Sequence, residues 1–137
     1  RFNAKLIANA TLGKEWTRRK DNGKIKVTGF NGRLTYSGGF RDTPIDAAAS
    51  AKSGRTVYLE DQAFSLQQGA FYRLDLRLYL KWNKPGRHNT LSLDIQNSTN
   101  RKNTAFSYYD TQLGQIVEKK QLGIIPIINY RVELGGK

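Results

Sequence analysis

The amino-acid sequence predicts an all-β fold, an antiparallel meander in which each strand pairs with the next one along the chain. Three observations support this prediction: apolar and polar residues alternate over long runs, the connections between runs alternate between short and long, and aromatic residues lie near the ends of the runs. Strict alternation places the apolar side chains on one face of a strand, whereas an α-helix needs apolar residues three and four positions apart.

Composition narrows the function classes. The 137 residues include no Cys, which excludes a disulfide framework, a thiolate metal site and a Cys nucleophile. No run approaches the ~18 continuous apolar residues of a membrane helix, so a membrane role would have to use strands. Because the chain contains no Met and opens on Arg1 without a signal-peptide pattern, we expect a fragment or a processed piece.

The first two strands are expected at residues 2–16 and 25–37. The apolar face of the first comprises Phe2, Ala4, Leu6, Ala8, Ala10 and Leu12, and the run closes on Trp16. The second places Phe30, Leu34 and Tyr36 on one face and Asn31, Arg33 and Thr35 on the other. Its regularity is weaker because Gly29 and Gly32 interrupt it.

The third strand, expected at residues 70–83, carries the clearest alternation. Its apolar face comprises Tyr72, Leu74, Leu76, Leu78, Leu80 and Trp82, and its opposite face comprises Arg73, Asp75, Arg77, Tyr79 and Lys81. The run is about as long as the ~9–11 residues that a tilted membrane-spanning strand needs.

The last two strands are expected at residues 89–97 and 122–134, followed by a tail at 135–137. Pro85 and Gly86 mark the hairpin turn before the fourth strand, which alternates Leu91, Leu93 and Ile95 with polar residues. The apolar face of the fifth comprises Leu122, Ile124, Pro126, Ile128, Tyr130, Val132 and Leu134. Because Pro cannot donate a ladder hydrogen bond, Pro126 predicts an edge strand or a bulge.

The connections have unequal lengths. Those at residues 17–24 and 83–89 are short, and those at 37–69 and 98–121 are long. Short turns on one side and long loops on the other are typical of outer-membrane barrels. Aromatic residues near both ends of the strands would form the two interfacial girdles of such a barrel. The sequence therefore predicts that residues 1–134 are part of a transmembrane β-barrel, with a soluble β-sandwich as the alternative.

Several ordered segments carry a family resemblance. Residues 69–77, 90–101 and 124–132, together with the loop segments 38–46 and 54–58, resemble the C-terminal part of Bacteroidetes-type TonB-dependent receptors. The resemblance implies a strand segment of an outer-membrane transporter that imports a bulky nutrient or metal chelate. The implied partners are the remainder of the barrel, its plug domain, the TonB complex through an upstream part of the protein, and outer-membrane lipid.

One position departs from the family pattern. The family usually ends on an aromatic residue that the barrel-assembly machinery reads, whereas this chain has Leu134, followed by Gly135, Gly136 and Lys137. The departure concerns the assembly signal, and it leaves open whether the tail is native.

No group of residues indicates catalysis. We expect that the chain is not an enzyme and that it has no catalytic residue, no cofactor and no metal site. The charged residues of the third and fourth strands could contact a plug domain or an anionic substrate: Arg73, Asp75, Arg77, Lys81 and Asp94. Hairpin parity instead favours pairing across strands, with Arg77 opposite Asp94. Substrate contacts are expected in the long loops, where residues 98–121 contain Phe106, Tyr108 and Tyr109, without an assignment to single residues.

Two other functions fit parts of the sequence. The formal net charge of +12 and the interleaved aromatic residues would suit a soluble basic β-domain that binds nucleic acid or other polyanions. A passive porin or adhesin barrel would share the predicted architecture. The apolar face of the third strand, which carries Leu74, Leu76, Leu78 and Leu80, distinguishes a soluble domain from a barrel. A soluble sheet must cover this face with another layer, whereas a barrel presents it to lipid. On the barrel interpretation no nucleic-acid partner is expected, and the isolated piece should aggregate.

Overall fold

A computed structural model describes residues 4–20 and 23–135 of the chain. Contacts divide it into two units, which we call the sheet unit and the loop unit. The sheet unit comprises Asn9–Leu34, Arg73–Arg101 and Gly123–Lys137, and the loop unit comprises Arg1–Ala8, Thr35–Tyr72 and Lys102–Leu122. The predictions for Phe2, and for Gly136 and Lys137 of the tail, lie outside the described residues.

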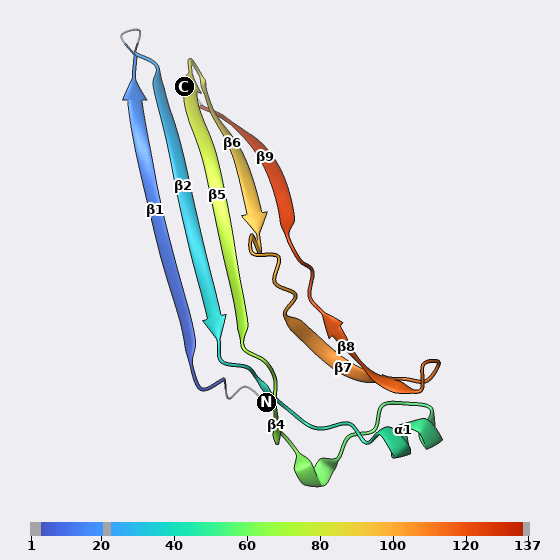
Figure 1. Ribbon diagram of the computed structural model, residues 1–137. Helices are drawn as coiled ribbons and strands as arrows, with labels where there is room; N and C mark the ends of the chain where they lie inside the picture. The colour runs from blue at the N-terminus through green and yellow to red at the C-terminus, as the bar shows by residue number, and fades with distance from the viewer. Residues whose placement is uncertain (1–3, 21–22, 136–137) are drawn as a thin grey trace. The chain divides into compact units, whose positions relative to one another are not determined.

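The sheet is a five-stranded antiparallel meander, as predicted (Figure 1). Its strands, in their order across the sheet, are β1 (Ile7–Arg19), β2 (Ile25–Ser37), β5 (Phe71–Lys84), β6 (Arg87–Gln96) and β9 (Ile125–Leu134). Because β9 is the last strand in this order, Pro126 lies in an edge strand, one of the two settings that the sequence predicts for it.

β2 begins and ends at the predicted residues, 25 and 37, and β9 ends at the predicted Leu134. The other strand ends lie within a few residues of the predicted ones. β1 starts later than predicted, after Lys5 with its positive φ of 57°, and continues past Trp16 to Arg19. β6 ends before Asn97, whose φ is 51°. β9 starts at Ile125 because the preceding Ile124 N–H donates to the Asn100 side chain at 3.1 Å instead of joining the ladder. Alternation alone does not reveal these local breaks.

The register places the apolar residues of neighbouring strands on one face. Leu78 of β5 pairs with Leu93 of β6, which pairs in turn with Ile128 of β9. Two residues further along, Leu80 pairs with Leu91, and Leu91 pairs with Tyr130. We call this surface the apolar face, and we call the opposite surface the charged face.

The short connections lie at one end of the sheet and the long ones leave from the other end. The β1–β2 turn closes with the Lys20 N–H donating to the Lys24 carbonyl at 2.9 Å, and the β5–β6 turn contains Gly86 with φ 68°. The N–H of Gly135, directly after β9, donates to the Gly86 carbonyl at 3.0 Å. The chain therefore returns to the short-turn end of the sheet as β9 finishes.

The long connections, predicted only as loops, contain secondary structure of their own. Their elements are β3 (Arg41–Asp42), α1 (Ala47–Ser53), η1 (Glu60–Gln62), β4 (Leu66–Gln67), β7 (Thr104–Asp110) and β8 (Gln115–Lys120). Asp46 caps α1 by accepting from the Ala49 N–H at 2.9 Å, and Gly54 ends it with φ 66°. In the described residues, no helix has the length and apolar composition needed to cross a membrane.

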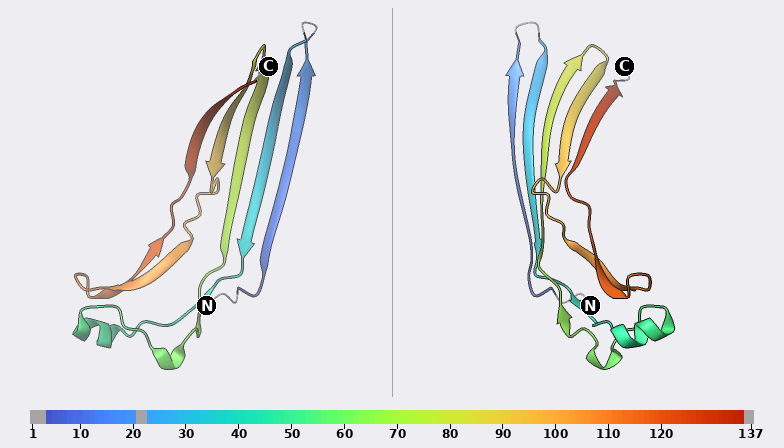
Figure 2. Two further views of the ribbon diagram at one scale, coloured as in Figure 1. Left: turned by 180° about the vertical axis from the view of Figure 1, so that it is seen from behind. Right: turned by 45° about the vertical axis from the view of Figure 1, so that its right-hand side comes forward.

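The distribution of buried residues in the sheet unit is inverted relative to a soluble domain. The sheet is a single layer (Figure 2). Within its described residues, the buried side chains are polar and include Asn89 and Ser92, which are only 2% and 3% exposed. Large apolar side chains are exposed instead, such as Leu12 at 74% and Ile128 at 78%. The buried apolar residues of the described chain, Ala4 and Tyr109, belong to the loop unit. The described sheet unit therefore has no apolar core of its own.

Candidate functional site on the charged face

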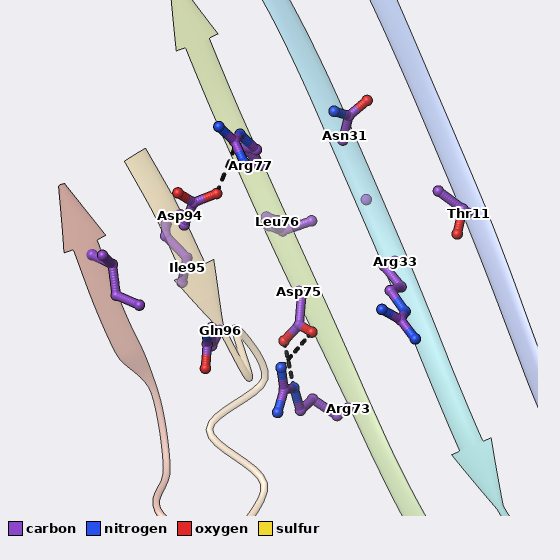
Figure 3. A pocket seen from close by; sticks show the side chains of 12 residues that line it. Thr11, Asn31, Arg33, Arg73, Asp75, Leu76, Arg77, Asp94, Ile95 and Gln96 are labelled. Atoms are coloured by element: carbon purple, nitrogen blue, oxygen red, sulfur yellow. Dashed lines mark hydrogen bonds and ion pairs between the residues drawn. The ribbon is translucent and has the colours of Figure 1, made fainter. Parts of the chain in front are cut away.

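The charged residues that were predicted to lie on one side of the third and fourth strands lie together on the charged face. Alternation places them on one side of neighbouring strands, and the register then decides which of them meet. Arg77 lies opposite Asp94, and its Nε is 3.4 Å from the Asp94 Oδ1 (Figure 3). Ser92 donates from its hydroxyl to the Asp94 Oδ2 at 3.2 Å. The predicted cross-strand pair is therefore confirmed. At this partial exposure such a pair contributes about 0.2–1 kcal/mol.

Arg73 and Asp75 pair within one strand, a contact that the expectation of pairing across strands did not include. Arg73 donates from Nε and Nη2 to the two Asp75 carboxylate oxygens at 2.7 and 2.8 Å. The Asn97 N–H adds a third hydrogen bond to Asp75, at 2.9 Å. Residues two apart in a strand share a face, so the long Arg73 side chain can fold back along β5 to its neighbour. The Asp75 carboxylate therefore accepts three hydrogen bonds.

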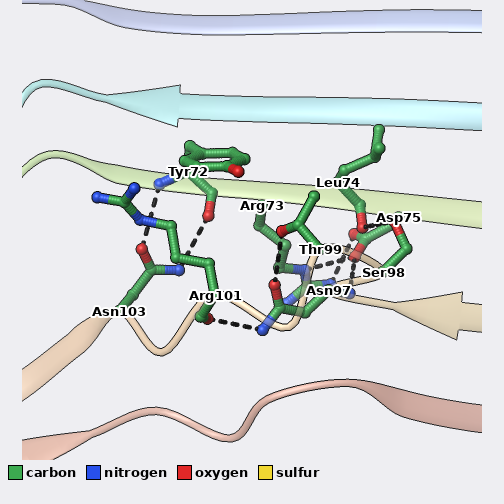
Figure 4. A network of polar contacts seen from close by, with 9 residues as sticks. All are labelled: Tyr72, Arg73, Leu74, Asp75, Asn97, Ser98, Thr99, Arg101 and Asn103. Atoms are coloured by element: carbon green, nitrogen blue, oxygen red, sulfur yellow. Dashed lines mark hydrogen bonds and ion pairs between the residues drawn. The ribbon is translucent and has the colours of Figure 1, made fainter.

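An asparagine-containing turn after β6 supports this network, and the sequence analysis missed it (Figure 4). Asn97 donates from Nδ2 to the Arg101 carbonyl at 2.8 Å, and Ser98 donates from both N–H and hydroxyl to the Leu74 carbonyl at 2.7 and 3.0 Å. Asn97 and Asn100 adopt positive φ angles of 51° and 54°, a conformation that Asn tolerates better than most residues. The sequence signal for this turn is the presence of three closely spaced asparagines, at positions 97, 100 and 103.

Asn103, in the loop unit, makes a paired contact of the same kind. Its Oδ1 accepts from the Tyr72 N–H at 3.2 Å, and its Nδ2 donates to the Tyr72 carbonyl at 3.0 Å. The side-chain amide thus replaces a neighbouring strand for this residue. Asn103 is buried, which fits a structural role.

Tyr79 connects three strands on the charged face. Its hydroxyl donates to the Glu15 carboxylate of β1, which also pairs with the Lys81 ammonium at 3.2 Å. Between these strands the ring passes over Gly29 of β2, where an added Cβ would lie 2.1 Å from the Tyr79 Cζ. The Lys81 ammonium is 4.8 Å from the centre of the same ring. Gly29, which weakens the sequence pattern, is the residue that leaves room for Tyr79.

Replacing Gly29 by Ala is therefore expected to displace the Tyr79 ring and to weaken its bond to Glu15. The expected loss is about 1–3 kcal/mol of unfolding free energy, the usual cost of overpacking a fitted site. Denaturant titration, in the medium in which the chain folds, measures this loss of unfolding free energy. Gly32→Ala is the matched control, because its Cβ would meet Leu76 at an ordinary 3.6 Å. Equal losses for the two variants would contradict the assigned role of Gly29.

The comparisons leave the family open. No protein-family model, curated protein or solved structure matches this chain.

The apolar face carries an aromatic cluster near the short-turn end. Trp82 of β5 stacks on Tyr130 of β9 with ring centroids 6.1 Å apart, and the Tyr130 hydroxyl donates to the Asn89 Oδ1 at 2.9 Å. Each ring thus combines an apolar body with a polar group, a combination that suits a boundary between water and an apolar medium.

The loop unit holds the three aromatic residues expected near substrate. Phe106 and Tyr108 lie on one face of β7 with ring centroids 6.1 Å apart, and the Lys119 ammonium is 5.8 Å from the Tyr108 ring. Tyr109 points to the other face and is buried, so it packs the unit instead. Lys120 and Thr104 donate to Glu118 and hold the pKa of its carboxyl below the usual value. In the described residues, no cluster of His, Asp and Glu has the arrangement of a metal site.

Proposed function

We propose that this chain forms strands of a transmembrane β-barrel in a cell outer membrane, and that its apolar face contacts lipid. The observation that carries the proposal is the inverted burial of the sheet. Large apolar side chains such as Ile128 are exposed on one face, whereas the polar Ser92 on the opposite face is buried. A bilayer would remove the apolar face from water, and an aqueous lumen would accept the charged face.

Strand length and turn pattern support the same proposal. β1 and β2 have 13 residues each, β5 has 14, and β6 and β9 have 10, against the ~9–11 that a tilted membrane strand needs. The short turns at one end and the structured long connections at the other fit periplasmic turns and extracellular loops. The Trp82–Tyr130 stack would belong to the aromatic girdle on the short-turn side.

The free edges favour a larger barrel. In the described part of the chain, β1 and β9 are the two ends of the strand order. Five strands are fewer than the eight of the smallest common membrane barrels, so further strands would pair with these edges. The remainder of the same barrel is therefore the first partner that we propose.

Within this class, we propose the C-terminal segment of a TonB-dependent transporter that imports a bulky nutrient or metal chelate. The support is the resemblance of the strand and loop segments to that family. On this proposal the plug domain faces the charged surface, the TonB complex acts through an upstream part of the protein, and the role is transport rather than catalysis. The pairing of Arg73, Arg77 and Lys81 with carboxylates argues against a polyanion-binding face, because these charges are already partly neutralised.

The test is the medium in which the purified chain folds. We expect aggregation in dilute buffer, and β-type circular dichroism with a dispersed state in detergent micelles or lipid vesicles. A folded, dispersed monomer in plain buffer would overturn the proposal. If that monomer also bound an oligonucleotide with an affinity that fell steeply with salt, the basic β-domain would be the better assignment.

A further inference from the structure

A pocket of about 330 Å³ opens on the charged face of the sheet unit (Figure 3). Its polar lining includes Asn31, Arg33, Asp75, Arg77, Asp94 and Gln96. This volume is at the lower end of the range that small-molecule sites occupy, and it suffices for a ligand group of a few atoms.

The two carboxylates of the pocket already have partners. Asp75 accepts two hydrogen bonds from Arg73 and one from the Asn97 N–H. Asp94 pairs with Arg77 and accepts from the Ser92 hydroxyl. Each carboxylate is therefore already paired with an arginine.

Arg33 is the cation that remains. Among the described residues, no carboxylate lies within ion-pair distance of its guanidinium, although its charge acts on nearby Asp75. Three arginines therefore line the pocket with only two aspartates, which leaves it one positive charge in excess. A guanidinium offers planar, paired donors that match the two oxygens of a carboxylate.

Polar groups beside Arg33 complete the site. Asn31 lies two residues earlier on the same face of β2, and Gln96 of β6 also lines the pocket. Gly13 of β1 leaves space for Asn31, since an added Cβ there would lie 2.2 Å from the Asn31 Oδ1. Side-chain amides can donate to an anion without adding charge, so they would orient a ligand that Arg33 neutralises.

We propose that this pocket binds a carboxylate, either of a small free ligand or of an acidic side chain of a polypeptide, with Arg33 as its direct ion-pair partner. The excess of one charge selects a monoanionic group, and the paired donors of Arg33 select its planar shape. The site uses only the charged face, so it does not depend on which medium covers the apolar face.

The test follows the Arg33 Nε–H signal by nuclear magnetic resonance, with the full chain in the medium in which it folds. The titrants are acetate and a blocked tripeptide with a central aspartate, at constant ionic strength set with chloride. We expect a saturable shift, with affinity at least about tenfold weaker in Arg33→Gln, the usual loss when a charged hydrogen-bond partner is removed. Because a variant without Arg33 lacks this signal, each unlabelled variant competes with the labelled wild-type chain for the titrant, and the change in the wild-type shift reports the affinity of the variant.

Two further variants keep the test decisive. Arg33→Lys retains the charge but not the paired donors, so its affinity should fall between those of the wild type and Arg33→Gln. Arg131→Gln is the matched control, because Arg131 lies on the charged face, pairs with Glu133 at 2.6 Å and does not line the pocket. It should bind as the wild type does.

The two titrants distinguish the sources of the carboxylate. Tighter binding of the tripeptide than of acetate would assign the pocket to a polypeptide side chain, and equal binding would assign it to a small free ligand. A shift that grows linearly with either titrant, or an affinity unchanged in Arg33→Gln, would overturn the proposal.

Discussion

Replacing Ile128 by Arg should destabilise the folded sheet by about 2–4 kcal/mol when the chain is folded in lipid vesicles, the cost of an arginine near the bilayer midplane. Ile128 is 78% exposed and pairs with Leu93, in the middle of the apolar face. In water an arginine at so exposed a position would cost within about 0.5 kcal/mol, as most surface substitutions do. The size of the effect therefore reports the medium that the apolar face contacts.

Asn129→Arg is the matched control for this prediction. Asn129 is the next residue of β9, lies on the charged face, and lines a polar pocket with Arg77 and Ser92. An arginine there should change stability by much less than the substitution at Ile128. Urea titration in vesicles, followed by tryptophan fluorescence, measures both variants. Equal small effects would contradict lipid contact on the apolar face.

The strands were predictable because alternation is a property of the chain itself. Any antiparallel pairing that keeps the apolar side chains together must align Leu78 with an apolar residue of the next strand, and the short Pro85–Gly86 turn restricts the choice of register. The same reasoning placed Arg77 opposite Asp94. These features follow from period two and from a short turn, which are both visible in the residues.

The parts that were missed depend on individual side chains and on special backbone conformations. Alternation cannot show that Arg73 would fold back to Asp75 within its own strand. It also cannot show that Gly29 makes room for a tyrosine from the neighbouring strand, because a glycine in a strand is more often a weak point. The turn at Asn97 replaces ladder hydrogen bonds with side-chain hydrogen bonds, so its pattern carries no periodicity.

The two faces of the sheet are stabilised by different interactions. On the charged face, hydrogen bonds and ion pairs hold neighbouring strands together, as Tyr79 and Glu15 do across β2. On the apolar face, large side chains such as Ile128 are exposed, so their contribution to stability depends on the medium that covers them. Substitutions on the charged face should therefore test the internal structure of the sheet, and those on the apolar face should test its environment.

Replacing Gly39 by Ala should cost roughly 2–5 kcal/mol of local stability in the loop unit. Gly39 has φ 62°, which costs a residue with a Cβ about 1–2 kcal/mol. An added Cβ would also lie 2.1 Å from the Gln68 carbonyl oxygen, and such overpacking adds about 1–3 kcal/mol. The Gln68 backbone cannot move away freely, because its N–H donates to the Phe40 carbonyl at 2.9 Å beside the β3–β4 pair.

Gly54→Ala separates the two contributions. Gly54 has a similar φ of 66°, but an added Cβ would meet no atom within 4 Å. Its cost should therefore be the backbone strain alone, about 1–2 kcal/mol. Hydrogen exchange of the Gln68 amide measures the first variant, and exchange of the Ser50 amide, which donates to the Asp46 carbonyl in α1, measures the second. If Gly39→Ala left the Gln68 amide as protected as in the wild type, the β3–β4 pair would not hold this connection in place. A large loss of protection would mean that the connection has a defined structure, which can position binding residues.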